Sequence, residues 1–467
     1  MTIDMLPDDV IIEIFRFFVD HNAGWRRLVQ VCQRWRNLVF GSPLHLGVKL
    51  HCAARTSLRE MLDVWPALPI SIKQQSCSRL SQVEHENLFA ILELHRRVCE
   101  IDLMEDLNEF LKEVGQKMQK PFPVLTKLFL TSSSPSLLVL PNSFLGGSTP
   151  RLRELELKHI SFPALPDLLL STTNLRYLCL RSIPSSMYIP SQVMVTCLSV
   201  MTKLQVLAIK FDSSRFQHSQ TSLPSPSLTC TVLPALTFLR FRGRCNYLED
   251  LVASINAPLL KAMFITFFEE YAYNTPQLYK FISCTNQLRS PRRVDVVFSG
   301  QTIRVELYRQ TDPVSDPFLM LEVLYQDSDR RLSSLAKLSH SSLASLSTVE
   351  RLDIRHGKFD PFTRPHKIEK AEWLELLRRF VCVKDLHVAG LFQLSVMSAL
   401  AAFTRNGVTV LPALQNIFLA ELLPFGPLQD AVDQSIAARQ LSVHNWNRWH
   451  EISEESNRRP RAYLPQS

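Results

Sequence analysis

A six-residue frame, with leucine or another apolar residue at its first, fourth and sixth positions, recurs along most of this chain of 467 residues. The ten copies begin at Val98, Leu125, Leu152, Leu175, Leu204, Leu236, Leu260, Val349, Val383 and Leu414. Neighbouring copies begin 23 to 34 residues apart, except for one interval of 89 residues after Leu260. A pattern that returns at such intervals predicts stacked structural units, because one unit alone is too small to bury its apolar face.

The frame and its spacing are typical of leucine-rich repeats, in which each unit is a short strand followed by a helix. Several segments between the frames agree, because they carry apolar residues at helical spacing. These segments are Asp106–Gln116, Ala164–Leu170, Val193–Met201, Leu248–Ile255 and Trp373–Phe380. A single leucine-rich strand can match the frame by accident, but ten ordered matches favour true repeats. We therefore predict an irregular α/β solenoid without the asparagine of the regular repeat, which leaves its curvature open.

The long interval after Leu260 has a different pattern. Its runs RRVDVVF, TIRVELY and FLMLEVLY are rich in β-branched and aromatic residues, as strands are. They fit either degenerate repeats or an inserted sheet, so residues 260–349 form an irregular part of a repeat region that covers 44–424. The Ser-rich segment Leu332–Thr348 is predicted to be a helix or a loop. A helical pattern over Leu428–Val443 predicts a cap within residues 425–467, which end in a polar tail.

Residues 1–43 form a separate, helical pattern. In a helix that starts at Pro7, the polar residues Asp9, Glu13, Arg16 and Asp20 form one narrow stripe, and the rest of its surface is apolar. A second helical pattern comes next and ends at a Gly-Ser-Pro sequence. Two or three helices of this size rarely supply a sufficient core. Their apolar surface must therefore be covered by the rest of the chain or by another protein.

The same segment resembles an F-box. The similarity covers residues 5–41 and includes the Leu6-Pro7 opening and the Val-Cys-x-x-Trp sequence from Val31 to Trp35. The next sequences along the chain, VFGSPLHLGVKL and MLDVWPALPISI, are similar to those of F-box proteins of mushroom-forming fungi. The resemblance implies binding to a small Skp-type adaptor, which connects F-box proteins to a cullin and so to a cullin–RING ubiquitin ligase.

Carried over by motif position, the resemblance also implies an adaptor-binding surface. Its residues are Leu6, Pro7, Val10, Ile14, Leu28, Val31, Cys32 and Trp35, and the helical wheel adds Ile11 and Phe15. The alternative for any of them, and for Ile14 and Trp35 especially, is packing among the module's own helices.

A solenoid of this kind exposes the third, fifth and seventh positions of each frame on its concave surface. Several of these positions hold aromatic or arginine residues, which are enriched in protein-binding hot spots. The predicted substrate-binding residues are Phe129, Tyr177, Arg181, Lys210, Phe238, Arg240, Arg242, Phe264, Arg351 and Arg355. Their charge favours an acidic or phosphorylated segment of a protein substrate. The alternative is an ordinary solvated strand face with no single partner.

Composition argues against several other partners. The net charge of +8 is mild for this length and no long Lys/Arg block is present, so we do not expect nucleic acid as the partner. The ten cysteines are dispersed and never form C-x-x-C, which indicates buried thiols of an intracellular protein, cytoplasmic or nuclear. Acidic residues stand where a signal peptide would be basic. No apolar run reaches the roughly 18 residues that span a membrane.

The sequence carries no recognisable catalytic motif, so we predict neither an enzyme nor a cofactor or metal site. The Val83–Glu86 sequence groups metal-ligand residue types, but it lacks a second histidine at helical spacing and is better interpreted as a helix start. The leading hypothesis is a substrate receptor of a cullin-based ubiquitin ligase. The alternative is a non-catalytic repeat scaffold that binds a protein or RNA outside any ligase.

Overall fold

The computed structural model describes residues 5–19, 24–43, 46, 48–52, 68–74, 81–105, 108–134, 137–184, 188–212, 230–268, 275–299, 302–311, 315–324, 346–356, 370–389, 392–405, 410–419, 433 and 441–445. Within them the chain forms two compact units. Unit 1 comprises Met1–Ile189 and Thr196–Val206, and unit 2 comprises Pro190–Val195 and Leu207–Ser467.

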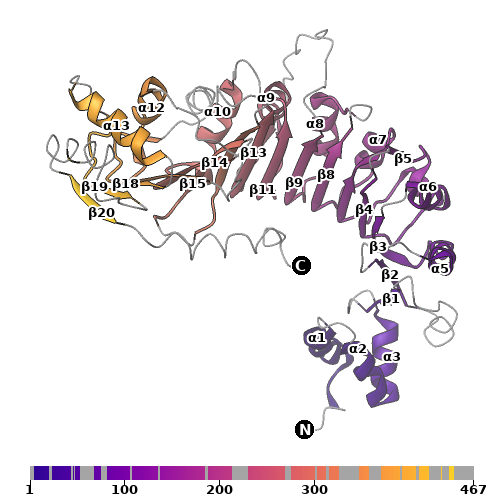
Figure 1. Ribbon diagram of the computed structural model, residues 1–467. Coiled ribbons are helices and arrows are strands. Elements are labelled where there is room, and N and C mark those ends of the chain that lie inside the picture. Colours follow the sequence, from indigo (N-terminus) through magenta and orange to yellow (C-terminus); the bar gives the residue numbers. More distant parts are fainter. Residues whose placement is uncertain are drawn as a thin grey trace. The chain divides into compact units, whose positions relative to one another are not determined.

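Unit 1 begins with three helices: α1 (Asp8–Val19), α2 (Gly24–Val31) and α3 (Gln33–Gly41) (Figure 1). Asp8 and Asp9 lie in the first turn of α1, where carboxylates complement the positive end of the helix dipole. Cys32 has an extended backbone, with φ −157° and ψ 169°, and this residue separates α2 from α3. The sequence prediction of two or three short helices in this segment agrees with the structure.

The three helices pack around a small apolar core of their own. Its buried side chains are Ile11, Phe15, Trp25, Leu28, Val29 and Val39. The ring of Phe15 meets the ring of Trp35 edge-on, with 4.8 Å between the centroids. Arg34 donates hydrogen bonds of 2.6 Å to the Asp8 carboxylate and to the Leu6 carbonyl, which ties α3 to the start of α1.

The rest of unit 1 repeats a strand and a helix. Its strands lie in the order β1-β2-β3-β4-β6-β8, and every neighbouring pair is parallel. The elements are β1 (Leu50–Cys52), β2 (Ile70–Lys73), α5 (Gln82–Leu92), β3 (Val98–Glu105), α6 (Asn108–Lys117), β4 (Lys127–Ser132), β5 (Leu138–Val139), β6 (Glu154–Lys158), β7 (Ile160–Ser161), α7 (Leu165–Leu170) and β8 (Tyr177–Ile183). The residues of helix α8 (Ser191–Ser199) are divided between the two units. Strands β5 and β7 form a separate small sheet.

Unit 2 continues with the same kind of repeat around one interruption. Its strands lie in the order β9-β11-β13-β16-β15-β14-β17-β18-β19-β20. The elements are β9 (Val206–Phe211), β10 (Thr231–Val232), β11 (Phe238–Gly243), α9 (Cys245–Ala253), β12 (Ile255–Asn256), β13 (Ala262–Phe268), α10 (Pro276–Cys284), β14 (Arg293–Ser299), β15 (Thr302–Tyr308), β16 (Leu319–Leu324), β17 (Arg351–His356), α12 (Lys370–Leu377), β18 (Asp385–Val388), α13 (Phe392–Arg405), β19 (Asn416–Leu419) and β20 (Ser442–Asn445).

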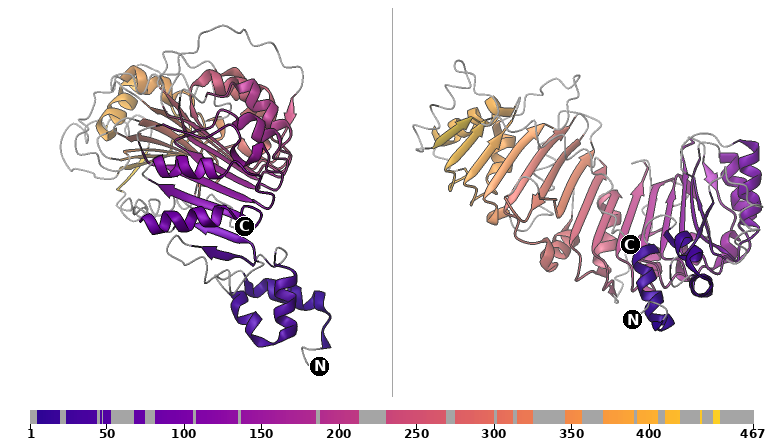
Figure 2. Two further views of the ribbon diagram at one scale, coloured as in Figure 1. Left: turned by 90° about the vertical axis from the view of Figure 1, so that its right-hand side faces the viewer. Right: turned by 90° about the horizontal axis from the view of Figure 1, so that it is seen from below.

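All ten sequence frames coincide with strands, which confirms the predicted α/β repeat fold. In the frame of β4, Leu125, Leu128 and Leu130 are buried, whereas Lys127 and Phe129 between them are half-buried on the other face. In each unit the helices lie on one face of the sheet, so the apolar frame positions pack against them (Figures 1 and 2). We call the opposite side of each sheet the open face. It carries the positions that the sequence analysis placed on a concave surface.

The irregular interval after β13 adds three strands to the sheet of unit 2. Strand β15 pairs antiparallel with β14 on one side and with β16 on the other. Strand β16 lies parallel to β13, and β14 lies parallel to β17. The runs RRVDVVF, TIRVELY and FLMLEVLY are therefore strands, as predicted. They extend the repeat sheet as an antiparallel meander instead of forming a second sheet.

The expected cap helix over Leu428–Val443 is wrong at its C-terminal end. Ser442 and Val443 lie in β20, which pairs parallel with β19 and so adds one more strand to the sheet of unit 2. Most of the remaining cap range, the tail after Asn445 and the Ser-rich segment before Leu346 lie outside the described residues.

The described cysteines are divided between core and surface. Cys99, Cys179, Cys197 and Cys245 are buried, Cys32 is half-buried, and Cys230, Cys284 and Cys382 are exposed. The prediction of buried thiols is therefore wrong for the last three. Cys284 ends helix α10 and Cys382 lies in the turn before β18, two places where the apolar frame does not extend.

Candidate functional site

The first candidate surface is an apolar stripe on helix α1. Val10, Ile14 and Phe17 are spaced by four and three residues, which places them on one side of the helix. Val10 is exposed, Ile14 is half-buried, and Phe17 is 82 % exposed. Val31, at the end of α2, is 60 % exposed. Large apolar side chains exposed together in this way are typical of a protein-binding surface.

The structure corrects three members of the predicted adaptor-binding set. Ile11 and Phe15 are only 1 % exposed, and Leu28 is also buried, so these side chains belong to the core of the helices themselves. The helical wheel could not separate them from their neighbours, because α1 is apolar around most of its circumference. Pro7, Val10 and Val31 are exposed, and the remaining members, which are Leu6, Ile14, Cys32 and Trp35, are half-buried. Phe17, which the predicted set did not include, is exposed and lies seven residues, about two helical turns, after Val10.

On the open face of unit 1, acidic and basic side chains of neighbouring strands pair with one another. Arg181 lies 3.2 Å from Glu156, and the Tyr177 hydroxyl donates a 2.9 Å hydrogen bond to the same carboxylate. The Lys127 ammonium lies 4.0 Å from the centre of the Phe129 ring. The predicted contact residues Phe129, Tyr177 and Arg181 thus come together, but Tyr177 is buried by its neighbours and offers little surface.

Ionisation on this face follows the same pairing. Burial opposes the charge of Glu100, but hydrogen bonds from Lys49 and Ser71 outweigh it and lower the pKa of this carboxyl. For Asp102, burial dominates over the nearby lysines and raises the pKa. The open face of unit 1 is therefore a set of mutually compensated charges and not a field of one sign.

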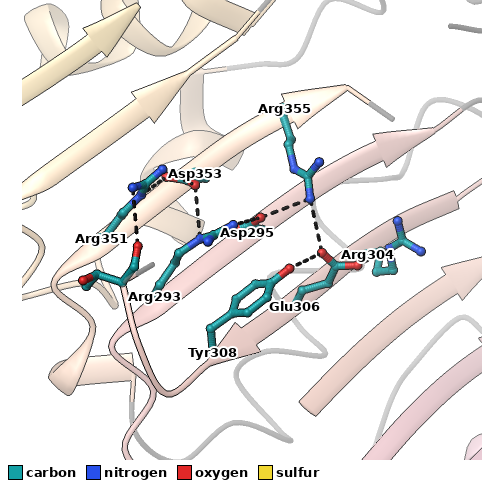
Figure 3. Close-up of polar contacts among 9 residues, drawn as sticks. Arg293, Asp295, Arg304, Glu306, Tyr308, Arg351, Asp353 and Arg355 are labelled. Atoms are coloured by element: carbon teal, nitrogen blue, oxygen red, sulfur yellow. Dashed lines mark hydrogen bonds and ion pairs between the residues drawn. The ribbon is translucent and has the colours of Figure 1, made fainter. Parts of the chain in front are cut away.

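The open face of unit 2 carries a network of arginines and carboxylates on β14, β15 and β17 (Figure 3). The arginine–carboxylate network consists of Arg293, Asp295, Arg304, Glu306, Tyr308, Arg351, Asp353 and Arg355. At its centre Arg293 donates two hydrogen bonds of 2.7 Å to Asp295, and its Nε lies 3.3 Å from Asp353. Asp295 is 0 % exposed.

Two of the predicted substrate-binding arginines belong to this network. Arg351 donates hydrogen bonds of 2.8 and 3.0 Å to Asp353. Arg355 Nη2 lies 3.1 Å from Asp295 and 3.4 Å from Glu306. Carboxylates of the sheet itself therefore compensate both guanidinium groups. Their first role is structural, which the sequence did not indicate because the partners lie on other strands.

The carboxylate of Glu306 has two more partners. The Tyr308 hydroxyl donates a 2.8 Å hydrogen bond to it, and Arg304 Nε lies 3.0 Å from its other oxygen. Arg304, Glu306 and Tyr308 alternate along β15, so all three point to the open face. The inserted meander thus supplies much of the network.

The charged groups at the centre of the network, Arg293 and Asp295, are buried away from water, which costs free energy of desolvation. Burial and the neighbouring Asp353 raise the pKa of Asp295, although the hydrogen bonds and charge of Arg293 and the charge of Arg355 act in the opposite direction. A carboxylate buried in this way is stable only with all of its cationic partners in place.

A second cluster on the open face of unit 2 combines arginine with phenylalanine. We call it the Arg–Phe patch: Phe238, Arg240, Arg242, Phe264 and Phe268, from β11 and β13. The Arg240 guanidinium carbon lies 5.6 and 5.2 Å from the ring centres of Phe238 and Phe264, and that of Arg242 lies 5.7 Å from Phe268. The rings of Phe238 and Phe264 meet edge-to-face at 5.1 Å.

The predicted contact residues in and beside this patch differ in exposure. Arg242 is exposed, Phe238, Arg240 and Lys210 are half-buried, and Phe264 is buried beneath the guanidinium of Arg240. The arginines therefore form the accessible surface and Phe264 supports it from below, which corrects the expectation that Phe264 itself contacts a partner.

An aromatic stack, which the sequence analysis missed, crosses the last strands of unit 2. The rings of His387, Phe418 and His444 come from β18, β19 and β20 at paired register positions. Their centroids are 4.2 and 4.9 Å apart and the rings are nearly parallel. Burial, with the charge of Arg351 in the same direction, lowers the pKa of His387 to about 3. His387 and Phe418 each occupy the fifth position of their frame, and this shared position was the sequence signal that could have predicted their contact.

Among the described residues, no three His, Cys, Asp or Glu side chains are grouped so that they could hold a metal ion. Glu84 and His85 lie instead in the first turn of α5, whose capping residue Ser81 forms a reciprocal pair of hydrogen bonds with Glu84. No helix in the described part of the chain is long and apolar enough to cross a membrane.

Comparison with known proteins identifies the helical segment. The F-box domain matches residues 3–46 of this chain. Among solved structures, the leucine-rich repeat-containing protein LegL7 from Legionella pneumophila is similar over 73 % of this chain and 91 % of its own, with 13 % sequence identity and a TM-score of 0.26. No protein with a curated description matches the chain.

The family match and the fold of the chain combine into one assignment. F-box domains in general bind Skp-type adaptors and act as adaptors of ubiquitin ligases. After the domain, units 1 and 2 consist of mostly parallel strands that alternate with helices. The chain carries an F-box domain at residues 3–46, which precedes leucine-rich-repeat-like α/β units.

Proposed function

We propose that this protein is the substrate-recognition subunit of a cullin–RING ubiquitin ligase. In this proposal the F-box domain binds a Skp-type adaptor, which links the chain to a cullin, and the open face of the repeats binds a protein substrate. The observation that carries the proposal is the apolar stripe of α1, in which Val10 and Phe17 are exposed and Ile14 is half-buried, within a domain that matches the F-box.

The energetics of this stripe favour a partner. Burying a phenylalanine or valine side chain contributes about 1.5–3 kcal/mol relative to leaving it in water. Phe17 and Val31 forgo most of that gain in the isolated chain, because both are largely exposed. The buried Ile11, Phe15 and Leu28 meanwhile hold the helices together, so that the stripe is presented on a preformed surface.

The contribution of the protein to ubiquitin transfer is proximity. A receptor that holds a substrate beside a ligase raises the effective concentration of the reacting groups without supplying a catalytic residue. The chain therefore needs only two binding surfaces, one for the adaptor and one for the substrate.

Co-purification with a Skp-type adaptor and a cullin tests this proposal directly. We expect the wild-type chain to form a stable complex with both. We expect Phe17→Asp combined with Val31→Asp to lose adaptor binding while the circular dichroism spectrum is kept, because both side chains are exposed. Val83→Asp is the matched control, since Val83 is an exposed valine on α5, outside the F-box domain.

Two outcomes would contradict the proposal. Full adaptor binding by the Phe17→Asp, Val31→Asp variant would show that the apolar stripe is not the adaptor surface. A wild-type chain that binds the adaptor but never recruits a cullin would place the protein outside any ligase, as a scaffold.

A further inference from the structure

We infer that the Arg–Phe patch of unit 2 binds the protein substrate through a carboxylate-bearing segment, in which an Asp or Glu side chain stands next to an apolar one. This inference rests on the proposed role of the open face as the substrate-binding surface. It names the part of that face which makes the contact and the chemical class that it recognises.

Several arginines of the open face are already paired with carboxylates. Arg181 is held by Glu156 in unit 1, and in unit 2 Arg351 and Arg355 are held by Asp353, Asp295 and Glu306. An external anion that approached these arginines would have to displace a carboxylate that is already in place. They are therefore poor sites for a substrate.

Arg242 has a different environment from these arginines. It is exposed, its guanidinium lies over the ring of Phe268, and no ion pair with a carboxylate is found for it in the described part of the chain. A guanidinium stacked on a ring keeps its N–H donors at the edge, where they can hold a carboxylate with two parallel hydrogen bonds. Stacking also restricts the side chain, so less conformational entropy is lost on binding.

Apolar surface lies beside the arginines of the patch. Phe238 is half-buried, and Met320 and Leu324 of β16 are half-buried at the register positions opposite Phe264 and Phe268. These side chains leave apolar area on the same face as Arg240 and Arg242. An acidic side chain with an apolar neighbour complements both parts of the surface.

A carboxylate fits the charge and geometry of the patch. Glu322 lies in the same cross-strand row as Arg242, with Thr266 between them, and accepts a 3.0 Å hydrogen bond from Thr266. Its charge, two strands from Arg242, lowers the positive potential of the patch and so reduces the advantage of a phosphate of nearly two negative charges over a singly charged carboxylate. The planar guanidinium of Arg242 can hold both oxygens of one Asp or Glu carboxylate, and we assign the site to that group.

Immobilised peptides test the inference on the full-length chain in complex with the Skp-type adaptor. The probes are an array of peptides that carry one glutamate beside leucine or phenylalanine, together with the same sequences bearing glutamine or phosphoserine in its place. We expect glutamate peptides to bind at least tenfold more tightly than their glutamine versions, and phosphoserine peptides to bind no more tightly than glutamate.

Variants locate the contact. Arg242→Glu should weaken binding of the glutamate peptides at least tenfold, and Arg242→Lys should weaken it less, because the charge is kept while the planar stacking is lost. Lys280→Glu is the matched control: it makes the same change of charge at an exposed position of α10, on the helix-covered side of unit 2, and should leave binding unchanged.

The results that would overturn the inference are distinct from those that overturn the proposed function. Equal binding of glutamate and glutamine peptides, no binding of any glutamate peptide, or unchanged binding by Arg242→Glu each refutes the patch as a carboxylate site. Tenfold tighter binding of phosphoserine assigns the site to phosphopeptides instead. In all of these cases adaptor binding, measured in the same samples, stays intact. Failure of the proposed function would instead appear as a loss of adaptor binding.

Discussion

Arg293 and Asp295 stand two residues apart on strand β14 and form two hydrogen bonds of 2.7 Å with both side chains buried. The two residues are close in sequence, but the charges of this buried pair are stabilised by side chains from a neighbouring strand. Asp353 and Arg355 from β17, which lies beside β14, supply the additional charges around it. The pair therefore couples the inserted meander to the next repeat along the chain.

Removing one partner should destabilise unit 2 strongly. Asp295→Ala leaves the Arg293 guanidinium buried without its main partner, and breaking a buried pair in this way costs about 3–5 kcal/mol. Urea unfolding, followed by hydrogen exchange of β14 and β17, measures the loss. The control is Glu13→Ala, which removes an exposed pair with Arg16 in α1 and should change stability by about 0–1 kcal/mol.

Replacing both members of the pair should cost less than replacing one. In Arg293→Met with Asp295→Leu no charge of the central pair remains to be desolvated, and buried pairs replaced by apolar residues of similar size are often neutral. The double variant should unfold at a higher urea concentration than Asp295→Ala. A double variant less stable than Asp295→Ala would mean that the remaining arginines need Asp295 more than Arg293 does.

His387 should make the stability of unit 2 depend on pH. Its pKa in the folded chain is about 3, below the usual 6.5, because the ring is buried and Arg351 and Arg293 oppose its charge while Asp385 favours it. Between these values the unfolded chain binds the proton and the folded chain does not. The stabilisation is therefore complete above pH 6.5 and falls on acidification by at most about 1.4 kcal/mol per pH unit.

His387→Phe should remove this part of the pH dependence while it preserves the stack on Phe418. Urea unfolding at several values between pH 4 and pH 7 provides the measurement. The matched variant is His444→Phe, the same substitution at the exposed end of the stack, and it should retain the pH dependence that His387 contributes. A slope that is identical in wild type and His387→Phe would mean that other groups dominate this pH range.

Gly243 should be intolerant of a side chain. A Cβ atom at this position would lie 2.7 Å from Phe211 Cδ2 and 2.7 Å from Phe241 Cζ, so both rings would have to move. Overpacking of this kind costs about 1–3 kcal/mol, and thermal unfolding of Gly243→Ala measures it. Gly41→Ala is the control, because a Cβ there meets no atom within 4 Å. Equal melting temperatures for the two variants would contradict the close packing around Gly243.

Substitution of Phe15 should destabilise helix α1, whereas substitution of Phe17 should not, although the two residues stand only two positions apart. Phe15→Ala opens a cavity beside Trp35 and should cost about 3–5 kcal/mol, so that α1 loses protection from hydrogen exchange. Phe17→Ala should keep that protection because the ring is exposed. Equal loss of protection in both variants would show that the two rings share one environment.

The strands and their faces could be predicted from the sequence because the signal is local. In the frame at Val349, the apolar residues Val349, Leu352 and Ile354 alternate with Arg351 and Asp353, and a strand places such alternating side chains on opposite faces. The apolar residues at the first, fourth and sixth positions recur in every frame. The sequence also predicted the strands of the irregular interval, whose composition has the β-branched residues that strands favour.

The contacts of each side chain could not be predicted in the same way, because register is a relation between distant segments. Arg351 looked like a residue of an open binding surface, and the reversed meander brings β14 beside β17, so that Arg293 and Asp295 stand next to it. Helix α1 shows the same limit. Nearly all of its surface is apolar, and only the positions of α2 and α3 bury Phe15 and leave Phe17 in water.

The F-box segment could be predicted from the resemblance of its motif residues, and the repeat period and the face of each strand residue from the spacing of apolar residues along one stretch of chain. Which of the arginines form ion pairs with carboxylates could be seen only in the folded chain. Arg355 and Arg242 occupy equivalent strand positions, and only the carboxylates on neighbouring strands distinguish them. Electrostatic energy depends on distance in space, and the frame in the sequence carries no information about that distance.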